Sequence, residues 1–178
     1  MAPSPKITKD RIKNALIILL NSFPLESITI KQLCDKAEIS RTSFYHYYNN
    51  LDEILKELFD ESFETSFGSK KWDLEYLYSK DFIIDVVDFF DKNTSLLLAL
   101  QKWELIQFVA NKKAKILHQE MLESMTHKSS NYSSYILTYL MGRYFIVCSQ
   151  WIKNGKTESK EDLITLLFHL QKFHNNIR

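Results

Sequence analysis

The chain has 178 residues, of which 45% are hydrophobic and 25% are charged, so it can form an apolar core and is not expected to be disordered. Glycine and proline are scarce, with three of each, and this disfavours turn-rich β folds in favour of long helices. The scattered positions of Gly68, Gly142 and Gly155 exclude a glycine-rich phosphate loop, and a net charge of +1 indicates no particular partner.

Charge is spread unevenly along the chain. Residues 1–50 hold seven Lys or Arg against four Asp or Glu, whereas residues 51–178 hold 16 against 18. A basic excess in one segment is a feature of nucleic-acid binders, although an excess of three charges is weak evidence alone.

The cysteines and the apolar runs predict where the protein resides. Cys34 and Cys148 are far apart and form no Cys-x-x-Cys motif, so no disulfide framework is expected and a reducing cytoplasm is the simplest compartment. The longest apolar runs, such as 15–20, are too short to cross a bilayer, and the N-terminus has no hydrophobic signal region. The sequence therefore predicts a soluble cytoplasmic protein without membrane association.

Helical periodicity and capping signals predict the elements of the first part of the chain. The expected helices cover residues 8–22, 30–37, 41–48 and 51–67. Pro24 follows the first helix as a stop signal. Thr29 with Gln32 forms a capping box before the second helix, Ser40 is a candidate N-cap for the third, and the run 50–53 is a capping box for the fourth.

The remaining chain also reads as helix throughout. The expected helices cover residues 74–91, 96–102, 104–125, 132–153 and 160–174. Asn154 and Gly155 form a C-cap signal, and Ser159 to Asp162 resembles a capping box. The predicted fold class is all-α, with about nine helices.

The second and third helices are joined by only residues 37–40. A short tight turn of this kind is typical of a helix-turn-helix, in which the second of the two helices enters a major groove. The first turn of that helix holds Arg41, Thr42 and Ser43, whose side chains can bond base edges. The segment therefore predicts a DNA-reading element.

Aromatic residues fill the rest of this short helix. Tyr45, His46 and Tyr47 can bond phosphate or stack, so we expect at least some of them at the surface. Phe44 and Tyr48 are four positions apart on one face, and we expect them to anchor the helix to the core.

This segment resembles the TetR family of transcriptional regulators. The resemblance extends over about residues 8–55 and is specific over the third helix. It is carried by Ile28-Thr29-Ile30, Leu33, Ala37 and the run Ile39-Ser40-Arg41-Thr42-Ser43-Phe44-Tyr45-His46-Tyr47-Tyr48-Asn49-Asn50-Leu51-Asp52-Glu53-Ile54-Leu55. The rest of the chain resembles the family only in size, helicity and a weak likeness around residues 142–155.

The resemblance implies an architecture and a function. Residues 1–50 would form the helix-turn-helix DNA-binding domain, and residues 51–178 a helical domain for ligand binding and dimerisation. The implied protein is a homodimer through its last two helices that binds a palindromic double-stranded DNA operator. Repression is favoured over activation because occlusion needs no polymerase contact, and release by a small-molecule inducer is optional in this family. No catalytic residue, cofactor or metal site is predicted.

The family's functional positions map onto this chain residue by residue. The side chains implied at the DNA are those of Thr29, Lys31, Arg41, Thr42, Ser43, Tyr45, His46 and Tyr47. The candidates for lining a ligand cavity are Trp103, Phe108, Tyr139 and Arg143. Leu51 stands where the family usually has a lysine that supports a phosphate contact, so that role is not transferred; Asn49 or Asn50 is the neutral substitute.

Two other classes stay open at this stage. A helix-turn-helix co-activator that works through protein contacts is favoured slightly by the low basic charge and by Leu51 in place of lysine. An all-α enzyme is disfavoured, because the spacing of Asp81, Asp85 and Asp88 puts them on the solvent face of a helix. The five histidines show no ligand spacing, which also disfavours a metal site.

Overall fold

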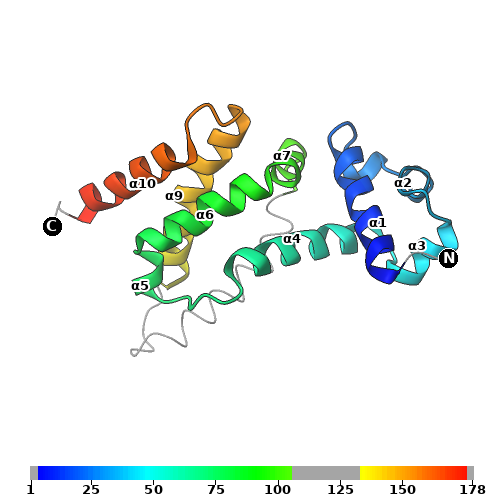
Figure 1. The fold of residues 1–178 in the computed structure, drawn as a ribbon, viewed down its shortest axis with the longest axis horizontal. Coiled ribbons are helices and arrows are strands. Elements are labelled where there is room, and N and C mark those ends of the chain that lie inside the picture. The colour runs from blue at the N-terminus through cyan, green and yellow to red at the C-terminus, as the bar shows by residue number, and fades with distance from the viewer. Residues whose placement is uncertain (1–3, 106–132, 176–178) are drawn as a thin grey trace. The chain divides into compact units, whose positions relative to one another are not determined.

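The computed structural model describes residues 4–105 and 133–175, and this part of the chain is helical with no strand (Figure 1). Its elements are α1 (Pro5–Leu20), the 3₁₀ helix η1 (Leu25–Ser27), α2 (Ile30–Ala37), α3 (Arg41–Tyr47), α4 (Leu51–Phe67), α5 (Leu74–Leu77), α6 (Lys80–Lys92), α7 (Thr94–Lys102), α9 (Ser133–Lys153) and α10 (Lys160–Asn175). The predicted all-α class is confirmed. The helix predicted over 104–125 falls almost wholly outside the described residues.

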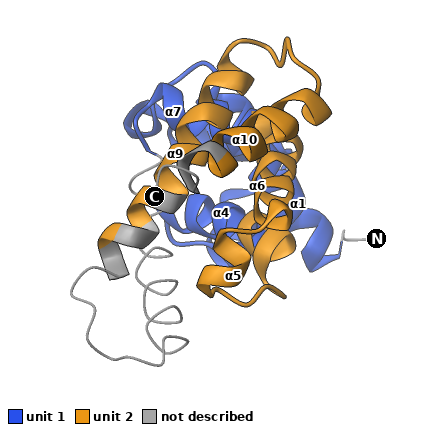
Figure 2. Cartoon of the chain, turned by 90° about the vertical axis from the view of Figure 1, so that its left-hand side faces the viewer, with its two compact units in different colours: residues 1–61, 95–109 blue, residues 62–94, 110–178 orange. Residues whose placement is uncertain are grey.

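The chain divides into two compact units (Figure 2). The first comprises residues 1–61 and 95–109, and the second comprises residues 62–94 and 110–178. Helix α4 therefore contributes its first part to one unit and its last turns to the other. The first unit extends beyond the segment 1–50, whose role as the DNA-binding domain stays a prediction.

Helix α1 supplies the main core surface of the first unit. It begins at Pro5, earlier than the pattern indicated, because Ser4 caps it by accepting a hydrogen bond from the backbone N–H of Ile7. Ile12, Leu16 and Leu20 are fully buried. Their spacing of four places them on the side of α1 that packs against α2.

A buried lysine connects α1 to α4 within the first unit. The side chain of Lys13 is only 7% exposed, and its Nζ lies 2.8 Å from Oε1 of Glu57 and 2.6 Å from Oε1 of Glu61. Lys9 reaches Glu57 as well, with its Nζ 3.0 Å from Oε1. An amine at this depth is tolerated only because carboxylates compensate its charge.

The second unit is built around α6, which packs against both α9 and α10. Its apolar face is fully buried. Phe63 of α4 and Trp72 of the segment between α4 and α5 continue the core, with their ring centroids 5.7 Å apart in a stacked arrangement. Phe82 meets Tyr144 of α9 edge-on at 5.5 Å. Aromatic contacts of this kind contribute beyond their buried area.

The single helix predicted over 74–91 is wrong, because the segment forms two helices. Helix α5 ends at Leu77, and Ser79 then caps α6 by accepting a hydrogen bond from the backbone N–H of Phe82 at 3.1 Å. The hydroxyl of Ser79 also donates to the carbonyl of Tyr76 at 2.7 Å. A serine that bonds nearby backbone in this way favours a helix boundary, which the apolar periodicity does not reveal.

Capping signals at other boundaries are confirmed. Gly155, two positions after the last residue of α9, has a φ of 77°, the left-handed conformation that glycine adopts without strain. The hydroxyl of Ser159 accepts from the backbone N–H of Asp162 at 3.1 Å at the start of α10.

Replacing Glu57 by Gln should destabilise the protein. The substitution removes the charge that faces Lys13 and Lys9 and leaves a buried amine with weaker compensation. Because Glu57 is 29% exposed, solvent reduces the effect, and we expect a loss of about 1–3 kcal/mol in the free energy of unfolding, measured by urea denaturation. Asp60→Asn, the same chemical change on α4, is the control and should shift stability by less than about 0.5 kcal/mol.

The effect of Glu57→Gln should depend on pH. Burial opposes ionisation of Glu57, but hydrogen bonds from Lys13 and Lys9 outweigh it and hold the pKa below its usual value. A pKa depressed by folding stabilises the protein above the unfolded value of about 4.3, and this contribution is lost as the pH falls through the folded pKa. The stability difference between the two proteins should therefore be largest near neutral pH and shrink on acidification; a difference that stays constant would contradict this account.

Candidate nucleic-acid interface

The turn between α2 and α3 is held by backbone geometry. Glu38 ends α2 in the left-handed conformation, with a φ of 56°. The following N–H, that of Ile39, donates to the carbonyl of Cys34 at 3.0 Å and closes the helix end. Ser40 then caps α3 by accepting from the N–H of Ser43 at 3.0 Å. The predicted tight helix-turn-helix connection is thus present.

Helix α3 is fixed to the first unit by two aromatic rings. Phe44 is fully buried and Tyr48 is 3% exposed, as expected from their spacing, and their ring centroids lie 6.3 Å apart. The Nζ of Lys9 lies 5.1 Å from the centroid of the Tyr48 ring. Burial, and then the carboxylate of Glu57, raise the pKa of Tyr48, so its hydroxyl stays protonated at all physiological pH values.

The opposite face of α3 is open to solvent. Arg41, Thr42 and His46 are exposed, and Tyr45 is 56% exposed although it is a large aromatic residue. Ser43 and Tyr47 are half-buried.

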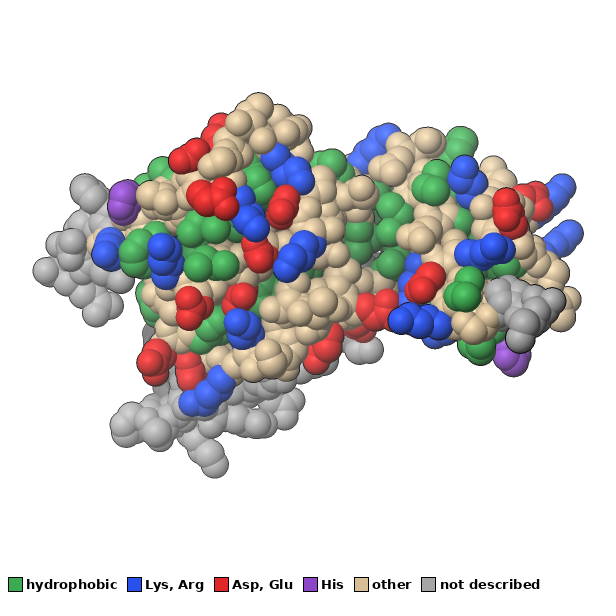
Figure 3. All heavy atoms as spheres, in the orientation of Figure 1, with side chains coloured by type: hydrophobic (Ala, Val, Ile, Leu, Met, Phe, Trp, Pro, Cys, Tyr) green, Lys and Arg blue, Asp and Glu red, His purple; other side chains and the backbone are tan. Residues whose placement is uncertain are grey.

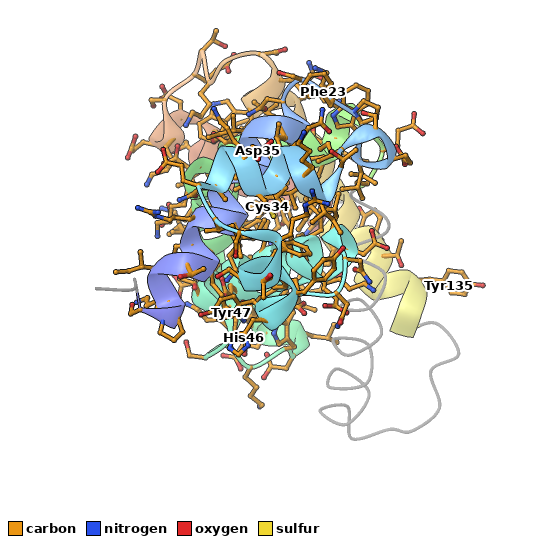
Figure 4. The ribbon with its side chains drawn as sticks, turned by 90° about the vertical axis from the view of Figure 1, so that its right-hand side faces the viewer. Phe23, Cys34, Asp35, His46, Tyr47 and Tyr135 are labelled. Atoms are coloured by element: carbon orange, nitrogen blue, oxygen red, sulfur yellow. The ribbon has the colours of Figure 1, made fainter. Side chains whose placement is uncertain are left out.

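The imidazole of His46 and the ring of Tyr47 meet edge-on, 4.9 Å apart, and Figure 4 shows both side chains on α3. None of the six α3 side chains that the sequence predicts at the DNA is thus fully buried. Their contact with DNA stays a prediction.

The N-terminus of α2 carries the predicted phosphate contacts of Thr29 and Lys31. Thr29 forms the predicted capping box: its Oγ1 accepts from the N–H of Gln32 at 3.2 Å, and its own N–H donates to Oε1 of Gln32 at 2.8 Å. The hydroxyl of Thr29 also lies 2.8 Å from that Oε1. These contacts occupy the polar groups of Thr29, so exposed Lys31 is the better placed of the two to reach a phosphate.

The start of α4 lacks both the lysine and a free neutral substitute. Leu51 is half-buried. The amide of Asn49 donates to Oε1 of Glu53 at 3.1 Å, and Oδ1 of Asn50 accepts from the N–H of Glu53 at 3.0 Å. The N–H of Asn49 binds the same carboxylate at 2.8 Å and holds the pKa of Glu53 below its usual value. Sequence reasoning missed Glu53, although its position in the capping box was the available signal.

The four residues predicted to line a ligand cavity do not all lie in one unit. The indole N–H of Trp103 donates to the carbonyl of Leu20 at 2.6 Å within the first unit. Tyr139 is exposed and Arg143 is half-buried, both on α9 of the second unit. Phe108 lies outside the described residues. The ligand role of these four residues stays a prediction.

Comparison with known proteins connects this geometry to a family. No family model matches the chain. A solved structure of the dihydroxyacetone kinase operon activator DhaS aligns with 96% of this chain and 97% of its own, with a TM-score of 0.58 and 20% identity. A TetR transcriptional regulator from Rhodococcus sp. RHA1 aligns with 94% of this chain and 95% of its own, with a TM-score of 0.55 and 15% identity. The chain has the TetR fold.

Curated sequences agree with this identification. The dhaKLM operon transcriptional activator DhaS of Lactococcus lactis is 24% identical over 164 residues, covering 86% of this chain and 84% of that protein. An HTH-type regulator of Bacillus subtilis, YxbF, is 32% identical over 57 residues, but the match spans only 15% of its length. The resemblance to the TetR family and the class of helix-turn-helix transcriptional regulator, both predicted from residues 8–55, are therefore confirmed.

Two other kinds of feature are absent from the described residues. No helix there is long and apolar enough to cross a membrane. No group of three or more His, Cys, Asp or Glu side chains in residues 4–105 and 133–175 could hold a metal ion.

Glycine at position 38 should stabilise the turn. Glu38 carries a side chain in a left-handed conformation that costs an L-residue roughly 1 kcal/mol, and its ion pair with Arg11 is long, at 4.0 Å, and exposed. Glu38→Gly should therefore be more stable than Glu38→Ala by about 1 kcal/mol, measured by thermal unfolding. Both variants lose the ion pair, so a lower stability of the Gly variant would show that the turn is not strained.

Proposed function

We propose that this TetR-fold protein regulates transcription by binding a two-fold symmetric operator as a homodimer, with one α3 in each of two successive major grooves. The observation that carries the proposal is the two-faced character of α3. Its apolar anchors Phe44 and Tyr48 are buried, while Arg41, Thr42 and Tyr45 are open to solvent. A helix with this arrangement presents its first turn to base edges.

The exposed residues suit two kinds of contact. The guanidinium of Arg41 can bond a guanine in two-point fashion, and Thr42 can bond a base edge or contact a thymine methyl group. Tyr45, His46 and Lys31 can reach phosphates and fix the register of the helix on the duplex. Arg41 is the only Lys or Arg of α3, so we assign it the largest share of base discrimination.

The dimer proposal rests on exposed apolar side chains of α9. One face of this helix packs inside the second unit through Tyr144, Cys148 and Trp151. On the opposite face Tyr135 is 71% exposed and Ile146 is 72% exposed. A helix that is apolar on both faces is expected to be buried on both, which a second copy of the chain would achieve.

Helix α10 adds a similar surface. Leu166 and Leu170 are one turn apart and are 52% and 55% exposed. Figure 3 shows hydrophobic side chains at the surface between charged ones. Gly142 of α9 supports the same interface, since a Cβ at this position would meet nothing within 4 Å in its own chain. Packing within the chain therefore does not require a glycine at this position, and the missing side chain would let a partner helix approach closely.

The sign of regulation and the inducer are the remaining parts of the proposal. The sequence favours repression, whereas the relative matched along most of the chain is named an activator. The sign depends on where the operator lies relative to the promoter, which the protein does not determine alone. An inducer would bind the second unit and would have to favour the conformation that does not fit DNA.

Replacing Arg41 by Ala should weaken operator binding by about 1–3 kcal/mol, the usual value of a two-point base contact. The measurement is a gel shift with DNA from around the gene's own promoter, at two salt concentrations. Affinity of the wild-type protein should fall steeply with salt, because binding to phosphates releases counterions.

Lys92→Ala removes an equal charge from α6 and serves as the control, since the side chain of Lys92 is 67% exposed and its ion pair with Asp88 is long, at 3.5 Å. Its affinity should equal that of the wild type. If no duplex binds in a salt-dependent way, the alternative of a co-activator that works through protein contacts is supported instead. Unchanged affinity in Arg41→Ala would remove the assigned role of that residue.

A charge placed at Leu166 should dissociate the dimer. Leu166→Asp would bury an unpaired carboxylate in the proposed interface, and we expect a dimer dissociation constant at least about tenfold higher by sedimentation. Thr165→Asp introduces the same side chain at the neighbouring exposed position and should leave the dimer intact. Equal effects of the two variants would argue against an interface at Leu166.

A further inference from the structure

Arg143 of α9 is surrounded by aromatic rings. Its guanidinium carbon lies 4.4 Å from the ring centroid of Tyr144, 5.5 Å from that of Tyr139 and 5.9 Å from that of Tyr78. Its Nη2 donates to the hydroxyl of Tyr144 at 2.6 Å. Three rings around one cation remove much of its water while leaving its charge in place.

The charge of Arg143 has no anionic partner in the part of the chain that the structure describes. No carboxylate there lies within salt-bridge distance, and the Nε is buried without a hydrogen-bond acceptor. An arginine has five N–H donors and is always charged, so a partly buried guanidinium is normally paired.

A second buried polar atom without a hydrogen-bond partner, on Gln171, lies beside Tyr78. Gln171 of α10 is 3% exposed, and its Nε2 donates to the backbone carbonyl of Tyr78. Its Oε1 is buried and accepts no hydrogen bond. An unpaired donor on Arg143 and an unpaired acceptor on Gln171 therefore flank Tyr78, and each such group is unfavourable until it is satisfied.

Two exposed lysines lie close in sequence to Tyr78 and Gln171 and carry positive charge. The Nζ of Lys80 lies 5.5 Å from the ring centroid of Phe168, and the Nζ of Lys172 lies 4.6 Å from the same centroid. Lys80 follows Tyr78 by two positions, and Lys172 follows Gln171 directly. Two like charges over one ring repel each other, and an anion nearby would relieve the repulsion.

We propose that Tyr78, Tyr139, Arg143, Tyr144 and Gln171, called the Tyr78 site, bind a small molecule that carries an oxyanion, either a carboxylate or a phosphate. The oxyanion pairs with the guanidinium of Arg143. A flat or apolar body of the ligand packs on the exposed rings of Tyr78 and Tyr139, and a hydroxyl or amine on it can donate to Gln171. Lys80 and Lys172 draw the anion toward the site.

The proposal deepens the proposed function, since it gives the chemical class of the inducer, and it rests on that function only for its effect on DNA. All five residues belong to the second compact unit. Binding is therefore measured on the full chain without DNA, so failure of the site and failure of operator binding are distinguishable.

The test uses sodium benzoate and inorganic phosphate as probes, with benzamide as the uncharged analogue of benzoate, in calorimetric titrations. We expect saturable binding of at least one anion and binding of benzamide weaker by about tenfold or more, since charged hydrogen bonds discriminate by that factor. Binding of benzoate alone indicates a carboxylate ligand, and binding of phosphate alone indicates a phosphorylated one.

Arg143→Gln should weaken anion binding by about tenfold or more, while Lys153→Gln, which removes one exposed charge from the end of the same helix, should leave it unchanged. Circular dichroism checks the fold of each variant. If Arg143→Gln does not fold, exposed Lys172→Gln replaces it, with an expected weakening of about twofold to threefold.

Three results would overturn the proposal. One is the absence of saturable binding by either anion, and another is equal binding by the wild type and the folded charge variant. The third is a dimer that weakens in Arg143→Gln while neither anion binds, which would mean that a carboxylate of a second copy pairs with Arg143.

Discussion

The burial of two rings, Phe44 and Tyr48, is the constraint on which the rest of the candidate interface depends. Helix α3 has seven residues, far fewer than an isolated helix needs to persist in water. It exists because Ser40 caps its start and because its aromatic anchors are removed from solvent. Burying those anchors also fixes the rotation of the helix, so the same two residues decide which side chains point outward. Stability and the presentation of Arg41 to a partner therefore have one cause.

Ion pairs between α1 and α4 stabilise the part of the first unit against which α3 packs. Lys13 and Lys9 on α1 share Glu57 on α4, and Lys13 also pairs with Glu61. Lys9 lies over the ring of Tyr48 as well. The α3 anchor is thus in contact with the same charge network that joins α1 to α4. A network in which each charge has a compensating neighbour is specific in geometry, because a shift of either helix leaves a charge unpaired.

Most of the fold followed from local signals in the sequence, because caps and apolar periodicity act over a few residues. The capping box at Thr29, the N-cap at Ser40 and the C-cap at Gly155 all lie where the pattern placed them. Interactions between distant segments gave no such signal. Nothing in the sequence around Lys13 indicates that it is buried, since its carboxylate partners are more than 40 positions away. The prediction of one helix over 74–91 was wrong for a different reason. The apolar periodicity continues across Ser79, so it allows one continuous helix as well as a new helix capped by Ser79.

The weak charge of α3 gives the proposed dimer a physical purpose. A single recognition helix with Arg41 as its only Lys or Arg, and with Asn49 and Asn50 occupied by Glu53, can neutralise few phosphates, so one copy is expected to bind DNA weakly. In a dimer, binding of the second α3 becomes intramolecular once the first is bound, which raises the overall affinity without new contacts to either half-site. Specificity for the operator would then depend on the spacing of the two α3 helices as much as on their side chains. Under the proposed function, a ligand bound to the second unit would release the operator by altering that spacing, because one α3 alone would bind the operator weakly.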